Sequence, residues 1–153
     1  MPNANAFRTI LIATGLALFA AAGTHAQTIV DQGKTHTPRG VGGYTDIAYA
    51  FAQGDVVTLK ARSSKMLARV VATLYPETPL ARVRDTKRPE LTLTVPQEGI
   101  VVFRFVSDRN GEAYIDYTVT RVAGPGGPAV YNTKVKWKEP IIEVGGRIPE
   151  RDQ

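Results

Sequence analysis

The stretch Ala113–Thr120, AYIDYTVT, decides the fold class of this 153-residue chain. Ala113, Ile115, Tyr117 and Val119 occupy every second position, with Tyr, Asp and Thr residues between them. Successive side chains of a β-strand point to opposite faces of the sheet. This period of two therefore predicts a strand with one face on a core and the other in water.

Similar runs recur along the chain. Asp55–Arg62, Arg69–Tyr75 and Leu91–Val95 alternate in the same way. Tyr44–Ala52 and Ile100–Ser107 are more continuously apolar, which is typical of strands buried on both faces. Proline and glycine residues close most of these runs. The pattern predicts an all-β chain of seven to nine antiparallel strands, arranged as a sandwich or a barrel.

Two turn signals stand between predicted strands. Gly54 lies in the sequence Gln-Gly-Asp and predicts a tight turn. Asn110-Gly111 is a strong hairpin signal, so we expect a short hairpin between Phe105 and Tyr114.

The N-terminal residues resemble an export signal. Arg8 is followed by an apolar run from Ile10 to Ala22, and Thr24-His25-Ala26 has small residues at the positions of a cleavage site. A run of this length is shorter than the roughly 20 residues needed to span a bilayer, and we expect no membrane span elsewhere. The prediction is an exported protein, periplasmic or extracellular. Its expected parts are a signal peptide (1–26), a flexible lead-in with at most one short strand (27–43), a β-sandwich domain (44–144) and a flexible tail (145–153).

Composition excludes several chemistries. The chain has no cysteine, which rules out disulfides, cysteine-ligated metals and thiol nucleophiles. After the predicted signal peptide there is one histidine, His36, in a segment expected to be a loop, so a Ser-His-Asp triad lacks an immobilised base. No phosphate-binding glycine loop is present. We therefore predict a protein that is not an enzyme, with no catalytic residue, no metal ligand and no cofactor.

The carboxylate residues leave two alternatives open, a glycoside hydrolase and a calcium site. Asp46, Glu98, Glu112 and Asp116 are candidates for the acid pair of a glycoside hydrolase, but no spacing singles out a pair. Asp46 and Asp116 interrupt apolar strands and are expected on the solvent face of one sheet. Residues 108–112 loosely resemble a calcium loop, but they lack its third acidic position and its distal glutamate, and a hairpin turn explains them better. A single bound Ca²⁺ nevertheless stays open.

Basic residues gather in two clusters within a chain of net charge +5. They suggest a surface that binds an anion or a partner, or, for the lysines, an edge strand protected from aggregation. Nucleic acid is not expected as a partner, because no aromatic residues are interleaved with the basic ones. The candidate residues of the two clusters are Arg82, Arg84, Lys87, Arg88, Lys134, Lys136 and Lys138.

The order of several short motifs resembles a known kind of module. These are Gln53-Gly54-Asp55, Phe103-Arg104-Phe105, and Tyr131 to Trp137 with the pattern Asn-Thr-x-Val-x-Trp. They resemble secreted bacterial β-sandwich modules of the GOLD and pre-peptidase C-terminal kind, and more closely uncharacterised exported proteins of Bacteroidetes-type bacteria. The resemblance implies a jelly-roll-like sandwich that acts as a binding module, and it implies no functional residue.

The predicted function is an exported, non-enzymatic module that binds a protein or a polysaccharide at the bacterial cell envelope. Tyr44, Tyr49, Tyr114 and Tyr131 are candidates for stacking on sugars, and each also suits packing between strands. Two alternatives remain: a small envelope glycoside hydrolase, and a structural subunit that assembles by donating residues 27–43 as a strand. The oligomeric state is not predicted.

Overall fold

The computed structural model describes residues 26–40, 42–108, 111–125 and 133–135. Residues 1–25 of the predicted signal peptide and the whole predicted tail lie outside this part. The described residues form nine strands: β1 (Thr28–His36), β2 (Tyr44–Phe51), β3 (Val56–Ser63), β4 (Leu67–Leu74), β5 (Thr78–Thr86), β6 (Glu90–Thr94), β7 (Gly99–Ser107), β8 (Tyr114–Val122) and β9 (Thr133–Val135).

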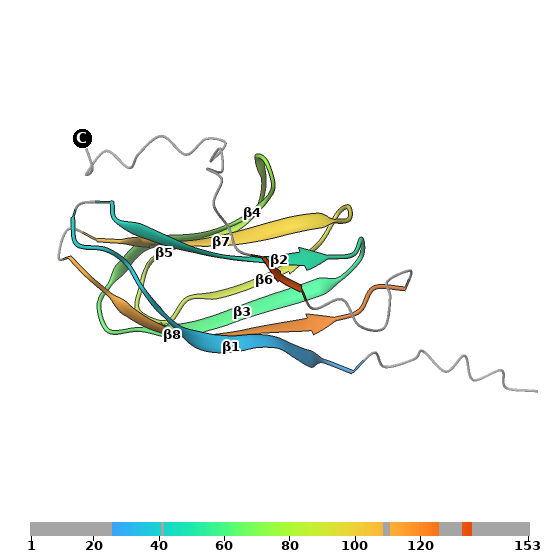
Figure 1. Cartoon of the computed structure of the whole chain (residues 1–153), viewed down its shortest axis with the longest axis horizontal. Helices are drawn as coiled ribbons and strands as arrows, with labels where there is room; N and C mark the ends of the chain where they lie inside the picture. The colour runs from blue at the N-terminus through green and yellow to red at the C-terminus, as the bar shows by residue number, and fades with distance from the viewer. Residues whose placement is uncertain (1–25, 41, 109–110, 126–132, 136–153) are drawn as a thin grey trace, which may run out of the picture.

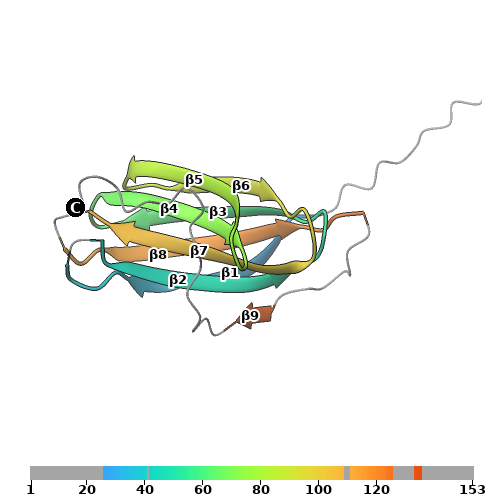
Figure 2. The ribbon, with the colours of Figure 1, turned by 90° about the horizontal axis from the view of Figure 1, so that it is seen from above.

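The strands form two facing sheets (Figure 1). The first has the order β1-β8-β3-β6 and the second β5-β4-β7-β2-β9, and all pairings are antiparallel. β1 pairs with β8, β2 with β7, β3 with β6 and β4 with β5, as in one long hairpin rolled up on itself. This nesting is the jelly-roll arrangement. The predicted antiparallel sandwich is therefore confirmed, and Figure 2 shows the sheets from above.

Alternation along β8 produces the core. Ala113, Ile115, Tyr117 and Val119 are all buried, as predicted from their spacing. The Tyr117 ring faces Phe105 of the second sheet, with 6.5 Å between the ring centroids. The core thus forms between the sheets from the inward residues of each strand.

Of the two strands predicted to be buried on both faces, Ile100–Ser107 is confirmed, since the last seven residues of β7 are buried. β2 is buried less uniformly. β4, which was expected to have one face in water, is buried at every residue. Val102 belongs to the face of its sheet that points away from the main core, where it packs with Ala48 and the partly buried Ile100. Continuous apolar character therefore marks the central strands of the second sheet.

A buried ion pair joins three chain segments at one end of the sandwich. The Asp55 carboxylate accepts a hydrogen bond from Arg121 Nε at 2.7 Å. It also accepts bonds from the backbone N–H groups of Ala52 at 3.0 Å and Gly124 at 3.1 Å. The backbone of Asp55 bonds to Val95 at the end of β6. One carboxylate thereby connects the β2–β3 turn, β8 and the residues that follow β8.

Two expectations about local structure were wrong. Residues 27–43 contain a nine-residue strand, β1, which pairs with β8 along its length, so this segment is not simply a flexible lead-in. The segment considered as a donor strand thus lies in its own sheet. β7 and β8 belong to opposite sheets and do not form the hairpin expected from Asn110-Gly111.

Candidate functional site

The outer face of the first sheet carries polar side chains in cross-strand rows. In one row Lys34 of β1, Asp116 of β8 and Arg62 of β3 are in register. The next row consists of Gln32, Thr118 and Lys60, and β6 extends it with Glu90. Outward residues of neighbouring strands lie only about 5 Å apart at their Cβ atoms, so the rows form one continuous polar surface.

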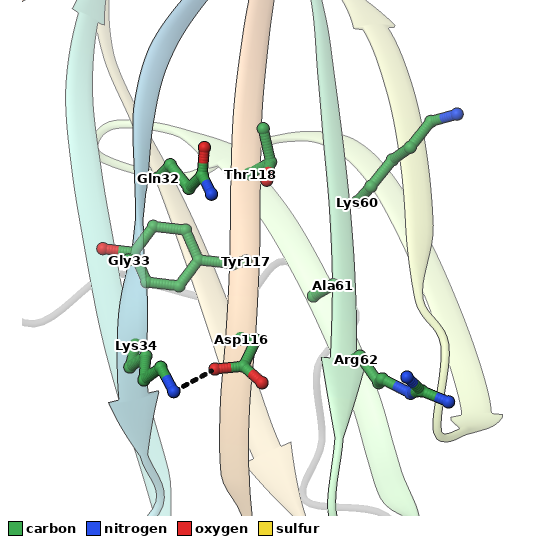
Figure 3. Close-up of a pocket in the computed structure, with 9 residues that line it drawn as sticks. All are labelled: Gln32, Gly33, Lys34, Lys60, Ala61, Arg62, Asp116, Tyr117 and Thr118. Carbon is green, nitrogen blue, oxygen red and sulfur yellow. Dashed lines mark ion pairs between the residues drawn. The ribbon is translucent and has the colours of Figure 1, made fainter.

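These rows line an open pocket of about 590 Å³, shown in Figure 3. We call it the sheet-face pocket. Its lining residues are Gln32, Gly33, Lys34, Lys60, Ala61, Arg62, Asp116, Tyr117 and Thr118. Three strands that are distant in sequence supply these side chains, and Asp116 is the one carboxylate among them.

The floor of the pocket is held by a hydrogen-bonded cluster beneath β1. The hydroxyls of Tyr49 and Tyr117 donate to the same Asp31 oxygen, at 2.6 and 3.1 Å. Gly33 leaves room for this arrangement, because a Cβ at that position would lie 2.9 Å from the Tyr117 hydroxyl. Burial raises the pKa of Tyr49 well above its usual value of 10.0, and the bond to Asp31 adds to the shift. Asp31 therefore ties β1 to both sheets.

Ion pairs on this face are exposed. Lys34 Nζ lies 3.5 Å from Asp116 Oδ1, and their side chains are 86% and 63% exposed. Lys60 Nζ lies 3.2 Å from Glu90 Oε1 in the neighbouring row. Exposed pairs contribute little to folding, typically about 0–1 kcal/mol, so these groups can exchange partners at low cost.

An aromatic ring adjoins the pocket on β8. Tyr114 precedes Asp116 by two residues on the same face, and its side chain is 61% exposed. The His36 ring lies beside it, with 6.0 Å between the centroids, and His36 Nε2 is 3.9 Å from Glu112. His36 therefore ends a strand next to an exposed tyrosine, whereas the sequence suggested a loop.

The other candidate tyrosines lie elsewhere. Tyr49 is fully buried in the core. Tyr44 is half-exposed on the second sheet, where the Arg104 guanidinium carbon lies 3.9 Å from its ring centroid. Tyr131 is outside the described residues. Tyr114 is thus the candidate that adjoins a pocket.

The structure divides the predicted arginine cluster between two surfaces. Arg82 and Arg84 are exposed on β5 of the second sheet, where they are in register with Val71 and Arg69. Arg88 follows β5 and lines a second pocket of about 340 Å³ with Lys60, Ala61, Arg62, Pro89 and Glu90. Lys87 is exposed beside Arg88. Only part of the cluster therefore adjoins the sheet-face pocket.

The lysine cluster is described in part. Lys134 belongs to β9, an edge strand that pairs with β2, and Lys136 and Lys138 lie outside the described residues. That this segment forms an edge strand is confirmed for residues 133–135. Binding of an anion by these lysines stays a prediction.

The expected placement of two carboxylates on one sheet was wrong. Asp116 is on β8 of the first sheet, while Asp46 is on β2 of the second. Asp46 is nearly buried and holds Arg104 through two bonds, of 2.9 and 2.8 Å. Asp46 of β2 and Arg104 of β7 lie opposite each other in a largely buried part of the second sheet, so each charge is neutralised by the other.

The described residues contain no group of three or more histidine, aspartate or glutamate side chains able to hold a metal ion. They also contain no helix with the length and apolarity to cross a membrane. The segment that loosely resembles a calcium loop, residues 108–112, falls partly outside the described residues, at Arg109 and Asn110.

No family model and no curated protein matches the chain. Among solved structures it is similar to the C-terminal CBM6 of LamC, a laminarinase of Zobellia galactanivorans, with a TM-score of 0.40 and 13% identity over 62% of this chain and 90% of that one. It is also similar to the CBM36-1 domain of a xylanase from the hindgut metagenome of Trinervitermes trinervoides, with a TM-score of 0.39 and 20% identity over 65% and 99% of the two chains. The resemblance to GOLD and pre-peptidase modules stays a prediction beyond the β-sandwich itself.

Proposed function

We propose that this protein is an exported, non-enzymatic module that binds a glycan on the outer face of its first sheet. The observation that carries the proposal is the exposed Tyr114 ring, which lies one row along β8 from Asp116 of the sheet-face pocket. A pyranose ring has an apolar face of C–H groups and a rim of hydroxyls, and an exposed aromatic face matches the first. The carboxylate, amide, hydroxyl and ammonium groups of Asp116, Gln32, Thr118 and Lys34 suit the second.

The shape of the site supports binding over hydrolysis. Hydrolysis of a glycosidic bond ordinarily needs two carboxyl groups about 5–10 Å apart across a cleft. The sheet-face pocket has one carboxylate, Asp116, and Asp46 lies on the other sheet. The site is also an open face rather than a cleft, so it suits a chain that lies across the strands. The predicted signal peptide supports a location at the bacterial cell envelope.

The experiment is a glycan array with the protein from residue 27 onward, followed by affinity electrophoresis in the polysaccharides that bind. Tyr114→Ala should weaken binding about fivefold, since an aromatic contact is worth roughly 1 kcal/mol. Tyr44→Ala removes an exposed tyrosine from the second sheet and should leave binding unchanged.

Two results would contradict the proposal. If Tyr114→Ala and the unchanged protein bind the glycan equally well, Tyr114 does not stack on the sugar. Release of reducing sugar from a bound polysaccharide, abolished in Asp116→Asn, would make the protein a hydrolase.

A further inference from the structure

The sheet-face pocket and the second pocket form one cationic surface, because Lys60, Ala61 and Arg62 line both. The four cations of this surface are Lys34, Lys60, Arg62 and Arg88, and its two anions are Asp116 and Glu90. The surface therefore carries a net charge of about +2 at neutral pH.

The two ion pairs of this surface involve both lysines and neither arginine. Lys34 pairs with Asp116, and Lys60 pairs with Glu90. Arg62 and Arg88 are both exposed, and among the described residues neither side chain makes an ion pair. The excess positive charge is thus concentrated where the two pockets meet.

Backbone hydrogen bonds join the segment that carries Arg88 to the strand that carries Arg62. The N–H of Ala61, next to Arg62, donates to the carbonyl of Pro89 at 3.0 Å. The N–H of Ser63, on the other side of Arg62, donates to the carbonyl of Lys87 at 2.8 Å. The Arg88 N–H itself bonds to Thr86 Oγ1 at 3.0 Å. The connection that carries Arg88 is therefore fastened to β3 on both sides of Arg62.

Resting on the glycan-binding function proposed above, we infer that the ligand is an acidic polysaccharide whose carboxylate or sulfate groups bind Arg62 and Arg88. A guanidinium presents a planar fork of donors that matches both anions with two parallel hydrogen bonds. Lys34 adds positive charge in the row of Arg62, and Lys60 adds it in the following row, farther from Tyr114. A chain that stacks on Tyr114 then meets cations in the next two rows of the face, those of Asp116 and Thr118.

The test compares polygalacturonate with its fully methyl-esterified form, and dextran sulfate with dextran. In each comparison the polymer backbone stays the same while the charge changes. We expect the charged polymer to bind at least tenfold more tightly, and its affinity to fall steeply between about 0.05 and 0.5 M NaCl because salt screens exposed charges. The variant Arg62→Gln with Arg88→Gln should abolish this preference.

A matched control exists on the other sheet. Arg82→Gln with Arg84→Gln makes the same change of charge at two exposed arginines of β5. This variant should keep the preference for the charged polymer. If it loses the preference while the Arg62 and Arg88 variant keeps it, the acidic ligand binds at β5, as the sequence suggested, and our assignment is wrong.

Other outcomes separate this inference from the proposed function. Equal, Tyr114-dependent binding of charged and neutral polymers would overturn the acidic ligand and keep glycan binding. Binding of no polysaccharide on the array or in this comparison would overturn both. Binding to phosphatidylglycerol vesicles, with loss in the Arg62 and Arg88 variant and no binding to either acidic polymer, would replace the polysaccharide with a membrane surface.

Discussion

Replacing Asp55 by alanine tests whether the buried ion pair holds the end of the sandwich together. Asp55 is fully buried and Arg121 is 2% exposed, so both charges depend on each other rather than on water. Removing one partner of a buried pair typically costs about 3–5 kcal/mol, because the remaining charge loses its counter-ion. The Ala52 and Gly124 N–H groups lose their acceptor as well. We expect the free energy of unfolding to fall by about 3–5 kcal/mol.

Urea unfolding followed by far-UV circular dichroism measures this loss. Many domains have about 5–15 kcal/mol of stability in total, so Asp55→Ala should lower the urea concentration at the unfolding midpoint by a large fraction. Asp116→Ala is the control, since it breaks an exposed ion pair on β8, the strand that carries Arg121, and should cost less than about 1 kcal/mol.

A double variant separates charge from hydrogen bonding. Asp55→Ala with Arg121→Met removes both charges, so it should recover about 1–3 kcal/mol of what Asp55→Ala loses. Recovery should be incomplete, because the two N–H groups stay without their acceptor. If Asp55→Ala costs no more than Asp116→Ala, the carboxylate does not hold this end of the sandwich.

Three further predictions concern other contacts. Gly124→Ala should cost at least about 2 kcal/mol in urea unfolding, because its Cβ would lie 2.4 Å from the backbone carbon of Gly54; an unchanged midpoint would show that the loop moves freely. Arg104→Lys should cost about 1–2 kcal/mol, since lysine keeps the charge but loses the two-pronged bond to Asp46; a loss as large as that of Arg104→Ala would contradict this. Tyr49 has a raised pKa, so its contribution is present below pH 10.0 and the stability should fall as pH rises above that value, by about 1.4 kcal/mol per unit. Tyr49→Phe should be less sensitive to alkali in a pH series of thermal melts, and identical slopes would refute the assignment.

Period-two alternation in four runs, and continuous apolar character in two more, were sufficient to predict the sandwich and six of its strands. These patterns missed β5 as a strand, because Thr78–Thr86 is an edge strand with mixed arginine, proline and small apolar residues. They also understated β1, where few residues are apolar and the strand depends on pairing with β8 and on the Asp31 cluster. Edge strands are stabilised by their neighbours, and their own pattern is correspondingly weak.

The strand topology and the residues of the site were harder to predict from the sequence. A turn signal such as Asn110-Gly111 predicts that the chain reverses, but not whether it returns within its sheet or crosses to the facing one. Asp116 and Tyr114 were visible as outward residues of one strand. Their partners Lys34, Arg62 and Arg88 come from distant segments, and only the pairing of β1, β8 and β3 brings the first two into register with Asp116.

β8 shows how one strand serves stability and binding separately. Asp116 and Arg121 are five residues apart, an odd number, so their side chains lie on opposite faces of the sheet. Arg121 faces inward and pairs with Asp55, where separation of the charges is costly. Asp116 faces outward and pairs with Lys34 in water, where separation costs almost nothing. A ligand can therefore displace the outer pair without loosening the fold, and substitutions on the outer face should change affinity while leaving the unfolding midpoint in place. In a chain without cysteine, the inner pair and the packed core provide the stability on which this exchange depends.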